Sequence, residues 1–405
     1  MEHLKKIIVS IELNEEEIEL GELVSDDKRI YFKYYSSFIK RGLEISPVKL
    51  KSDDTIHHAN ETPFDGLFGV FADSLPDGWG KLVLDRTLAA RGIAIDEVTV
   101  LDRLAYVGSN GMGALTYKPE MEPDVLALLH PELDEIAKAA HQIITGTATD
   151  GVDELYQLCG SSGGARPKIM VGYYSDSNQL IGTAKRLPDG YQHWLIKFPG
   201  SNDLPDIANI EFAYYKMALD AGIEMSESKL FKGRSGRAYF GTKRFDRDGN
   251  KRLHLHSAAG LMHDNFRLST MDYGHIMDCA FRLENDVRAY EKILRLAAFN
   301  VFAHNRDDHS KNFSFLMDET GTWKTSPAYD LTFSGSGHGM HSTMIMGESQ
   351  NPSKKHLMQL ADYFKINNAG KIIDQVQTVV LNWETYAELS EVSKESKARI
   401  SKVIG

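Results

Sequence analysis

The chain has 405 residues, of which 42% are hydrophobic and 25% are charged, so it is long enough for two or three packed domains of ordinary globular composition. Its formal net charge of -11 argues against a broad nucleic-acid-binding face, because such a face needs clustered Lys and Arg. A total of two cysteines argues against a disulfide framework or a cysteine zinc site. The sequence shows neither a signal peptide nor an apolar run of membrane-spanning length, so the expected location is the cytoplasm.

The first part of the chain is predicted to be rich in strands. Residues 7–13 and 29–35 are β-branched or aromatic. The sequence Leu-Pro-Asp-Gly at 75–78 predicts a turn, and the apolar spacing after it predicts an amphipathic helix that ends near Gly92. We group residues 1–120 into one amino-terminal domain.

Three features in and after this domain have both a structural and a functional interpretation. Asp73 and Asp77 fit a helix cap or a turn, although acids at such places also serve in catalysis. The glycines of residues 108–113 do not match a nucleotide-binding GxGxxG pattern, so we expect a tight turn before a strand. Residues 121–150, with a helix predicted at 133–144, are expected to connect two domains.

A second domain is predicted from about residue 151, and it opens with a run of small residues. Residues 160–168 read Gly-Ser-Ser-Gly-Gly-Ala-Arg-Pro-Lys and lead into a predicted strand at 169–174. Small residues let backbone N–H groups approach a phosphate closely, and the hydroxyls and Lys168 add further donors. The same composition also suits a flexible linker, so this run by itself leaves both interpretations open.

The next predicted strand, at 193–199, contains one lysine among apolar residues. Lysine is rarely buried without a partner. In a nucleotide site, Lys197 would contact the α- and β-phosphates and pair with a glutamate on a helix. Glu211, on the helix predicted at 210–221, is the candidate partner. The alternative is an edge-strand lysine whose ammonium group reaches solvent.

The rest of the chain is divided between a strand segment and a helical lobe. Residues 239–247 are predicted to form a strand and a turn whose backbone could hold the edge of an adenine. We group residues 151–250 into a nucleotide-binding part and residues 251–405 into a mainly helical carboxyl-terminal lobe. Residues 354–403 are expected to form two or three helices with solvated Lys and Glu faces.

Residues 305–312, Asn-Arg-Asp-Asp-His-Ser-Lys-Asn, lie between an apolar helical run and a predicted hairpin. A hairpin with its midpoint at Gly321 would place Asn312 beside Asp330 at its open end. Carboxylate and carboxamide oxygens suit Mg²⁺ bound to nucleotide phosphates, and Asp307 can accept the proton of an attacking hydroxyl. The pattern therefore predicts phosphoryl transfer, while an Asp-rich solvated loop is the structural alternative.

Five motifs in this order resemble the HipA family of bacterial serine/threonine kinases, the toxin components of HipBA-type toxin–antitoxin systems. The motifs are residues 160–168, 194–199, 243–247, 307–312 and 329–331. Residues 68–79 resemble the amino-terminal domain of the family, so the likeness covers most of the chain. The resemblance implies an α+β fold, with an α/β amino-terminal region and a mainly α-helical carboxyl-terminal lobe.

The resemblance also implies roles for single residues. Asp307 would be the catalytic base, Asn312 and Asp330 would bind Mg²⁺, and ATP would be the phosphoryl donor. Lys197 would contact the phosphates and pair with Glu211. The residues that the resemblance places around the nucleotide are Ser162, Gly163, Gly164, Ala165, Arg166, Lys168, Lys197, Lys243, Arg244, Phe245, His309 and Lys311.

In the family, a serine of the glycine-rich loop is autophosphorylated, which switches the kinase off. Ser161 aligns best with this serine, and Ser162 is adjacent to it. A dianion in a loop that holds ATP phosphates would repel the nucleotide. The chain departs from some members at Asp308, where they have glycine, and at residues 166–167, where Arg-Pro stiffens the loop.

The activity that the resemblance implies is ATP- and Mg²⁺-dependent phosphorylation of a Ser or Thr hydroxyl of a cellular protein. An aminoacyl-tRNA synthetase is the target in the best-known members, and a small HipB-like helix-turn-helix antitoxin is the expected partner. Contact with DNA is expected only through that antitoxin, and no contact with a membrane is expected. Two other functions stay open: a catalytically weak co-repressor bound to the antitoxin, and a small-molecule phosphotransferase.

Overall fold

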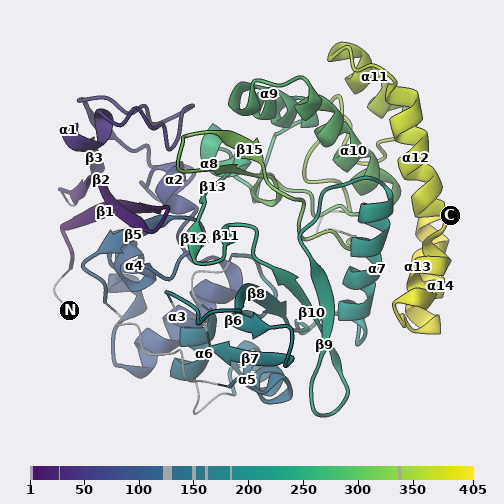
Figure 1. Ribbon diagram of the computed structural model, residues 1–405, viewed down its shortest axis with the longest axis horizontal. Helices are drawn as coiled ribbons and strands as arrows, with labels where there is room; N and C mark the ends of the chain where they lie inside the picture. The colour runs from purple at the N-terminus through teal and green to yellow at the C-terminus, as the bar shows by residue number, and fades with distance from the viewer. Residues whose placement is uncertain are drawn as a thin grey trace. The chain divides into compact units, whose positions relative to one another are not determined.

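The computed structural model describes residues 3–26, 28–121, 130–147, 152–159, 163–182, 185–335 and 339–405. The chain forms two compact units, which are described separately (Figure 1). The first unit comprises Met1–Asp203, Phe231–His256 and Met317–Gly321. The second unit comprises Leu204–Leu230, Ser257–Leu316 and Thr322–Gly405. The first unit mixes strands and helices, and the second is mainly helical, as expected from the sequence.

An antiparallel sheet with the strand order β4-β3-β2-β1-β5 forms the amino-terminal part of the first unit. The strands are β1 (Lys6–Leu13), β2 (Glu16–Ser25), β3 (Ile30–Tyr34), β4 (Ile56–His58) and β5 (Leu115–Lys118). The strands predicted at 7–13 and 29–35 are confirmed. Strand β2 is not predicted, because its glutamates obscure the alternation that buries Ile18 and Leu20.

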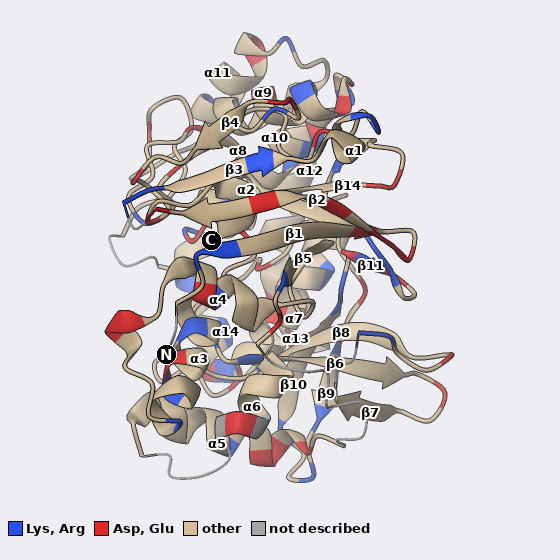
Figure 2. Ribbon diagram, turned by 90° about the vertical axis from the view of Figure 1, so that its left-hand side faces the viewer, with Lys and Arg blue, Asp and Glu red and all other residues tan. Residues whose placement is uncertain are grey.

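This amino-terminal sheet has a charged side and an aromatic side. Figure 2 shows basic and acidic residues on neighbouring strands, of which Lys6 and Glu22 form an ion pair. Exposed ion pairs contribute little to stability. On the buried side, the ring of Phe32 lies 4.8 Å from that of Phe71 and 6.2 Å from that of Phe68, between centroids. The aromatic contacts therefore hold the sheet to α2 (Gly69–Ala72).

The second sheet of the first unit includes the strand order β7-β6-β8-β10. Its strands are β6 (Lys168–Tyr174), β7 (Gln179–Gly182), β8 (Gln192–Lys197) and β10 (Ala238–Lys243). Strand β9 (Ser228–Lys232) begins in the second unit and ends in the first. Helices α3 (Gly78–Ala90), α5 (Leu133–Thr145) and α6 (Val152–Cys159) share one core with the sheet. Buried Trp79 of α3 and buried Trp194 of β8 belong to this core. The predicted helices and strands of this region are confirmed.

Shorter elements complete the first unit. They are α1 (Ser36–Ile39), a 3-10 turn η1 (Ile95–Glu97), α4 (Val100–Val107), the hairpin of β11 (Arg247–Asp248) and β12 (Lys251–Arg252), and β13 (His254–Ser257), of which Ser257 already belongs to the second unit. The turn predicted at 108–113 is confirmed, because it separates α4 from β5. Thr99 caps α4 with its side chain.

The second unit is built from helices around α10. Its elements are α7 (Ile207–Asp220), α8 (Ala258–Met262), α9 (Tyr273–Glu284), α10 (Arg288–Phe302), η2 (Ser310–Asn312), β14 (Ser314–Met317), β15 (Trp323–Thr325), α11 (Lys354–Tyr363), α12 (Ala369–Leu381), α13 (Trp383–Leu389) and α14 (Lys394–Ile404). Helix α10 packs against α9, α11 and α12, and α7 packs against α12 and α13 (Figure 1). None of the helices in the described ranges is long and apolar enough to cross a membrane.

Residues 354–403 form four helices rather than the two or three predicted. Lys365 and Asn368 have positive φ angles of 53° and 56°, which end α11 and start α12. Asn382 separates α12 from α13. The sequence pattern misses these breaks because the residues at them are polar and also suit the exposed face of a helix.

His254 and His256, on β13, are buried in the first unit. The Nε2 atom of His254 lies 2.8 Å from the carbonyl oxygen of Ile45. Burial lowers the pKa of His254 to about 3, and neighbouring His256 adds to this effect. The folded protein therefore holds His254 as a neutral imidazole at neutral pH.

We expect acid to destabilise the first unit through His254. Unfolding restores the ordinary pKa of 6.5, so between pH 6.5 and about 3 the unfolded chain binds a proton that the folded chain does not. Stability should therefore fall as the pH is lowered through this window, by up to about 1.4 kcal/mol per pH unit for one histidine. Urea unfolding at pH 7 and pH 5 measures this dependence. His254→Gln should show a shallower dependence than wild type, and an unchanged slope would contradict the assignment.

Candidate active site

The residues predicted to form the site are divided between the two units, so each set is described in its own unit. The first unit holds Gly163, Gly164, Ala165, Arg166, Lys168, Lys197, Lys243, Arg244 and Phe245. The second unit holds Glu211, Asp307, His309, Lys311, Asn312 and Asp330. Because buried Glu211 and Lys197 belong to different units, their pairing stays a prediction. Ser161 and Ser162 lie outside the described residues.

The turn before α3 holds the backbone of the glycine-rich loop. The carboxylate of Asp77 accepts the N–H of Gly164, and the N–H of Trp79 donates to the carbonyl of Gly164 at 3.0 Å. Lys168 donates from its ammonium group to the carbonyl of Gly163. Asp77 stands at the N-cap of α3, as the sequence suggests, but makes no side-chain capping bond there. Its carboxylate binds the loop instead.

Gly78 allows the two segments to approach this closely. Its φ angle is +44°, and a Cβ atom at this position would lie 2.6 Å from the carbonyl oxygen of Gly164. We expect Gly78→Ala to lower the free energy of unfolding by about 1–3 kcal/mol more than Gly92→Ala does. Gly92 is the matched control, because its φ angle is +77° and no described atom lies within 4 Å of its Cβ position. Urea unfolding measures both variants, and equal losses would contradict a tight contact at Gly78.

Two lysines lie opposite each other on β6 and β8. Lys168 and Lys197 are Cα partners in this antiparallel pair, and they are 5% and 8% exposed. Like charges directly opposite each other destabilise a sheet, so this pair favours an anion beside it. The ammonium group of Lys197 also lies 5.6 Å from the ring centre of Phe240, its partner on β10. This row of side chains suits the phosphates of a nucleotide.

The segment predicted to hold adenine lies at the end of β10. Lys243 is the Cα partner of Trp194, and the N–H of Arg244 donates to the carbonyl of His193 at 2.9 Å. The guanidinium group of Arg244 is buried and binds Asp246, at 2.9 and 2.7 Å. The side chain of Arg244 is therefore used within the protein, and its predicted contact with a nucleotide rests on its backbone.

The other predicted residues of the first unit are more open to solvent. Ala165 is exposed, and Arg166 and Phe245 are half-buried. The Nε atom of Arg166 lies 3.1 Å from a carboxylate oxygen of Asp203. This ion pair and the rigid Pro167 hold the end of the glycine-rich loop where it enters β6.

In the second unit, the loop after α10 exposes one acid and buries the next. The side chain of Asp307 is 59% exposed, with a carboxylate oxygen 3.8 Å from Nε2 of His309. The side chain of Asp308 is 0% exposed. Asp308 accepts hydrogen bonds from the hydroxyl of Tyr273 at 2.9 Å and the N–H of Ser342 at 2.8 Å. Asp307 is therefore the acid that a substrate can reach, and Asp308 fixes the loop.

The turn η2 brings Asn312 back to the same loop. Its Nδ2 atom donates to the carbonyl of Asp307 at 2.7 Å, which leaves the amide oxygen as the ligand for a cation. Phe266 lies beside Lys311 and His309, the two residues of this unit that are predicted to lie around the nucleotide. The ammonium group of Lys311 is 4.7 Å from the ring centre of Phe266, and the ring of His309 is 5.5 Å from it.

The predicted hairpin is confirmed, since β14 and β15 are neighbouring strands. The hydroxyl of Tyr329 donates to the carbonyl of Lys311 at 2.6 Å. These two residues directly precede Asp330 and Asn312, so the bond brings the two predicted metal ligands to the same end of the hairpin. Asp330 has a φ angle of 55°, a left-handed conformation that is uncommon outside glycine and Asn or Asp.

Sequence reasoning misses the residues that position this loop. Tyr273 and Ser342 are 35 and 34 positions away from Asp308 along the chain. His341, whose Nδ1 atom is 2.9 Å from the carboxylate, is also distant in sequence. No local pattern signals such contacts, because they depend on how α9 and the segment after β15 pack.

The first unit also contains a hydrogen-bonded Ser-His-Asp chain. The hydroxyl of Ser46 is 3.0 Å from Nε2 of His256, and Nδ1 of His256 is 2.6 Å from a carboxylate oxygen of Asp73. These contacts resemble those of a hydrolase triad. However, Ser46 is 1% exposed and His256 is 0% exposed, so no substrate reaches the hydroxyl. The three residues therefore link segments of the fold rather than form a second active site.

Comparison with known protein families gives two matches. The HipA-like C-terminal domain matches residues 160–383, and the HipA N-terminal domain matches residues 11–118. No match was found among curated proteins.

Two solved structures are similar to the chain. HipA of Shewanella oneidensis MR-1, in a complex with HipB and operator DNA, is 18% identical with a TM-score of 0.68, over 97% of this chain and 94% of that one. The Helicobacter pylori proinflammatory kinase CtkA is 11% identical with a TM-score of 0.40, over 60% of this chain and 88% of that one. The first likeness confirms the predicted α+β fold, with a β-rich amino-terminal region and a helical carboxyl-terminal part.

Proposed function

Because the chain belongs to the HipA family of serine/threonine protein kinases, we propose that it transfers the γ-phosphoryl group of ATP to a Ser or Thr hydroxyl of another protein. The observation that carries this proposal is the pair of buried lysines, Lys168 and Lys197, opposed on neighbouring strands beside the glycine-rich loop. Their charges would neutralise the phosphates of ATP. In the second unit, Asp307 offers an exposed carboxylate to the hydroxyl of a protein substrate.

In the proposed reaction, Asp307 acts on the acceptor hydroxyl, and Asn312 and Asp330 act on the phosphates through Mg²⁺. Asp307 accepts the proton of the hydroxyl as its oxygen bonds to the γ-phosphorus, and the bond to the β-phosphate oxygen breaks so that ADP leaves. Asn312 and Asp330 would hold Mg²⁺, since both supply oxygen ligands at one end of the hairpin. When bound, the ion neutralises charge on the β- and γ-phosphates.

We also propose that the kinase phosphorylates itself on Ser161 or Ser162. A dianion at either serine would enter the glycine-rich loop, whose backbone and lysine would otherwise face the phosphates of ATP. Like-charge repulsion would then lower the affinity for ATP and switch the kinase off. Asp77 already accepts one N–H of this loop, so a phosphoserine would compete with that carboxylate as well.

The family suggests the partner and the target that we propose. The similar Shewanella structure contains HipB and operator DNA, so we propose a HipB-like helix-turn-helix antitoxin as the partner, with DNA reached only through it. An aminoacyl-tRNA synthetase is the first substrate to test. The same complex favours one second role for this chain, that of a co-repressor bound to the antitoxin.

Intact-mass spectrometry tests the kinase proposal. Dephosphorylated wild-type protein is incubated with ATP and Mg²⁺, with and without excess EDTA, and then mapped by peptide. We expect one added phosphate on Ser161 or Ser162, which EDTA prevents. A protein that binds ATP but transfers phosphate neither to itself nor to a synthetase would favour the co-repressor role or a small-molecule acceptor.

A further inference from the structure

A pocket with a basic wall lies within the first unit. Of the described residues that line it, four are cationic and none is acidic. The cationic residues are Lys185, Arg244, Arg247 and Arg252. The empty volume is about 220 Å³, part of it open to solvent. Because the side chains that line it are polar and mostly cationic, the pocket suits a small anion or the charged end of a larger molecule.

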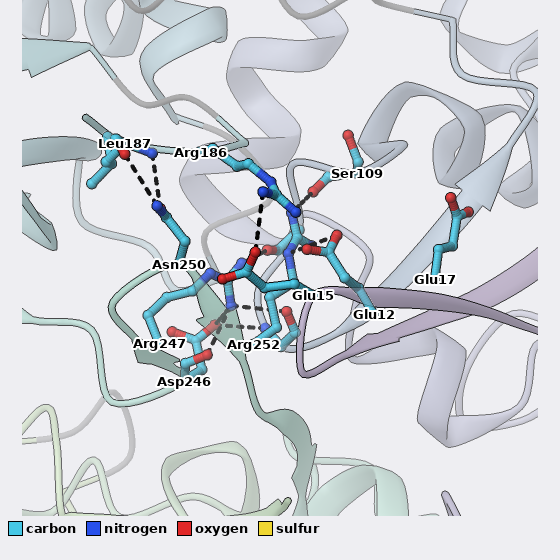
Figure 3. Close-up of polar contacts among 12 residues, drawn as sticks. Glu12, Glu15, Glu17, Ser109, Arg186, Leu187, Asp246, Arg247, Asn250 and Arg252 are labelled. Carbon is cyan, nitrogen blue, oxygen red and sulfur yellow. Dashed lines mark hydrogen bonds and ion pairs between the residues drawn. The ribbon is translucent and has the colours of Figure 1, made fainter. Parts of the chain in front are cut away.

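The ion pairs of the lining arginines leave the pocket with a net positive charge. Asp246 is shared, because one of its oxygens lies 2.7 Å from Arg244 and 2.7 Å from Arg247. Figure 3 shows Asp246 beside Arg247. Arg252 is 3.4 Å from Glu12. Burial, followed by the charge of Arg244, lowers the pKa of Arg247 well below its usual value. One carboxylate thus serves two buried guanidinium groups, which favours a further anion in front of them.

His193 supplies a second, independent indication of a ligand. It is 5% exposed and lines the pocket, and its Nε2 atom has no hydrogen-bond partner among the described residues. Burial, together with Arg244 and Arg247, lowers the pKa of His193 to about 3, so the ring is neutral. A buried polar atom of this kind calls for a partner. A hydrogen phosphate carries both an O–H group and acceptor oxygens, so it can satisfy either tautomer of the ring.

We propose that this pocket binds a phosphate group, either as free inorganic phosphate or as the end of a phosphate monoester. The anion would contact Lys185, Arg252 and Nε2 of His193, and the charges of Arg244 and Arg247 would attract it. It would also bridge separate parts of the unit, because Ser109 in the turn before β5 and Arg252 on β12 line the same pocket. Binding there should therefore raise the thermal stability of the protein. The proposal does not depend on the kinase function.

Isothermal titration calorimetry of the full chain with inorganic phosphate, in a chloride buffer of matched ionic strength and without ATP, tests the site. We expect saturable binding by wild type and binding about fivefold weaker in Lys185→Ala, since one charged contact is lost. The matched control is Arg186→Ala, which removes the same charge at the next residue. Arg186 is exposed and lies 3.0 Å from Glu15, so this variant should bind like wild type. His193→Phe, which keeps the ring but loses both nitrogens, should also weaken binding.

Further titrations identify the source of the phosphate group. Glycerol 3-phosphate binding as tightly as inorganic phosphate would indicate a monoester ligand, and binding of inorganic phosphate alone would indicate the free ion. Wild type that shows no saturable heat would overturn the proposal. Equal weakening in Lys185→Ala and Arg186→Ala would also overturn it, because that result would reflect net charge rather than a site. Thermal unfolding with and without phosphate checks that every variant is folded.

Discussion

Asp307→Asn is expected to lower the rate of phosphoryl transfer by about 10²- to 10⁴-fold, the usual contribution of a general base. The amide keeps the size of the side chain but cannot accept the proton of the hydroxyl. Affinity for ATP should change little, since the proposed role of Asp307 concerns the acceptor rather than the nucleotide. Single-turnover transfer from radiolabelled ATP gives the rate, and titration with a fluorescent ATP analogue gives the affinity.

Asp374→Asn is the matched control for this variant. The two aspartates are almost equally exposed, at 59% for Asp307 and 58% for Asp374, and both substitutions remove one negative charge. Asp374 pairs with Lys354 on the neighbouring helix α11. The control should transfer phosphate at the wild-type rate. Autophosphorylation retained by Asp307→Asn would remove Asp307 from the mechanism.

Asp308→Ala should destabilise the second unit by about 3–5 kcal/mol, because it leaves several buried donors without an acceptor. The carboxylate receives hydrogen bonds from Tyr273, Ser342 and Thr343, and Nδ1 of His341 lies 2.9 Å from it. Urea unfolding followed by circular dichroism measures the loss. The same variant should reduce kinase activity, since Asp308 holds the loop that carries Asp307.

Two further variants give reference values for the loss of stability expected in Asp308→Ala. Tyr273→Phe removes one hydrogen bond to Asp308 and one from Asn300, so a loss of about 1–2 kcal/mol is expected. Asp374→Ala, at an exposed ion pair, should leave stability nearly unchanged. An Asp308→Ala variant as stable as Asp374→Ala would show that the buried network does not hold the loop.

Local patterns predicted most elements of the fold. Runs of β-branched and aromatic residues located β1 and β3, and helical spacing after a Leu-Pro-Asp-Gly turn located α3. The hairpin around Gly321 was predicted from two short strands and a turn between them. These predictions succeed because each depends on residues that are close along the chain. The pattern failed at β2, where glutamates obscure the alternation, and in residues 354–403, where polar residues obscure the breaks between helices.

The sequence by itself determined the family, the order of the motifs and the residue types that phosphoryl transfer needs. Only the tertiary structure showed that Asp307 is exposed and Asp308 is buried, because identical side chains at adjacent positions differ only in what packs around them. The same reason applies to Asp77, whose carboxylate meets a loop 87 residues away. The basic pocket likewise joins distant segments. Burial and hydrogen bonding between distant residues depend on packing, and no local pattern records packing.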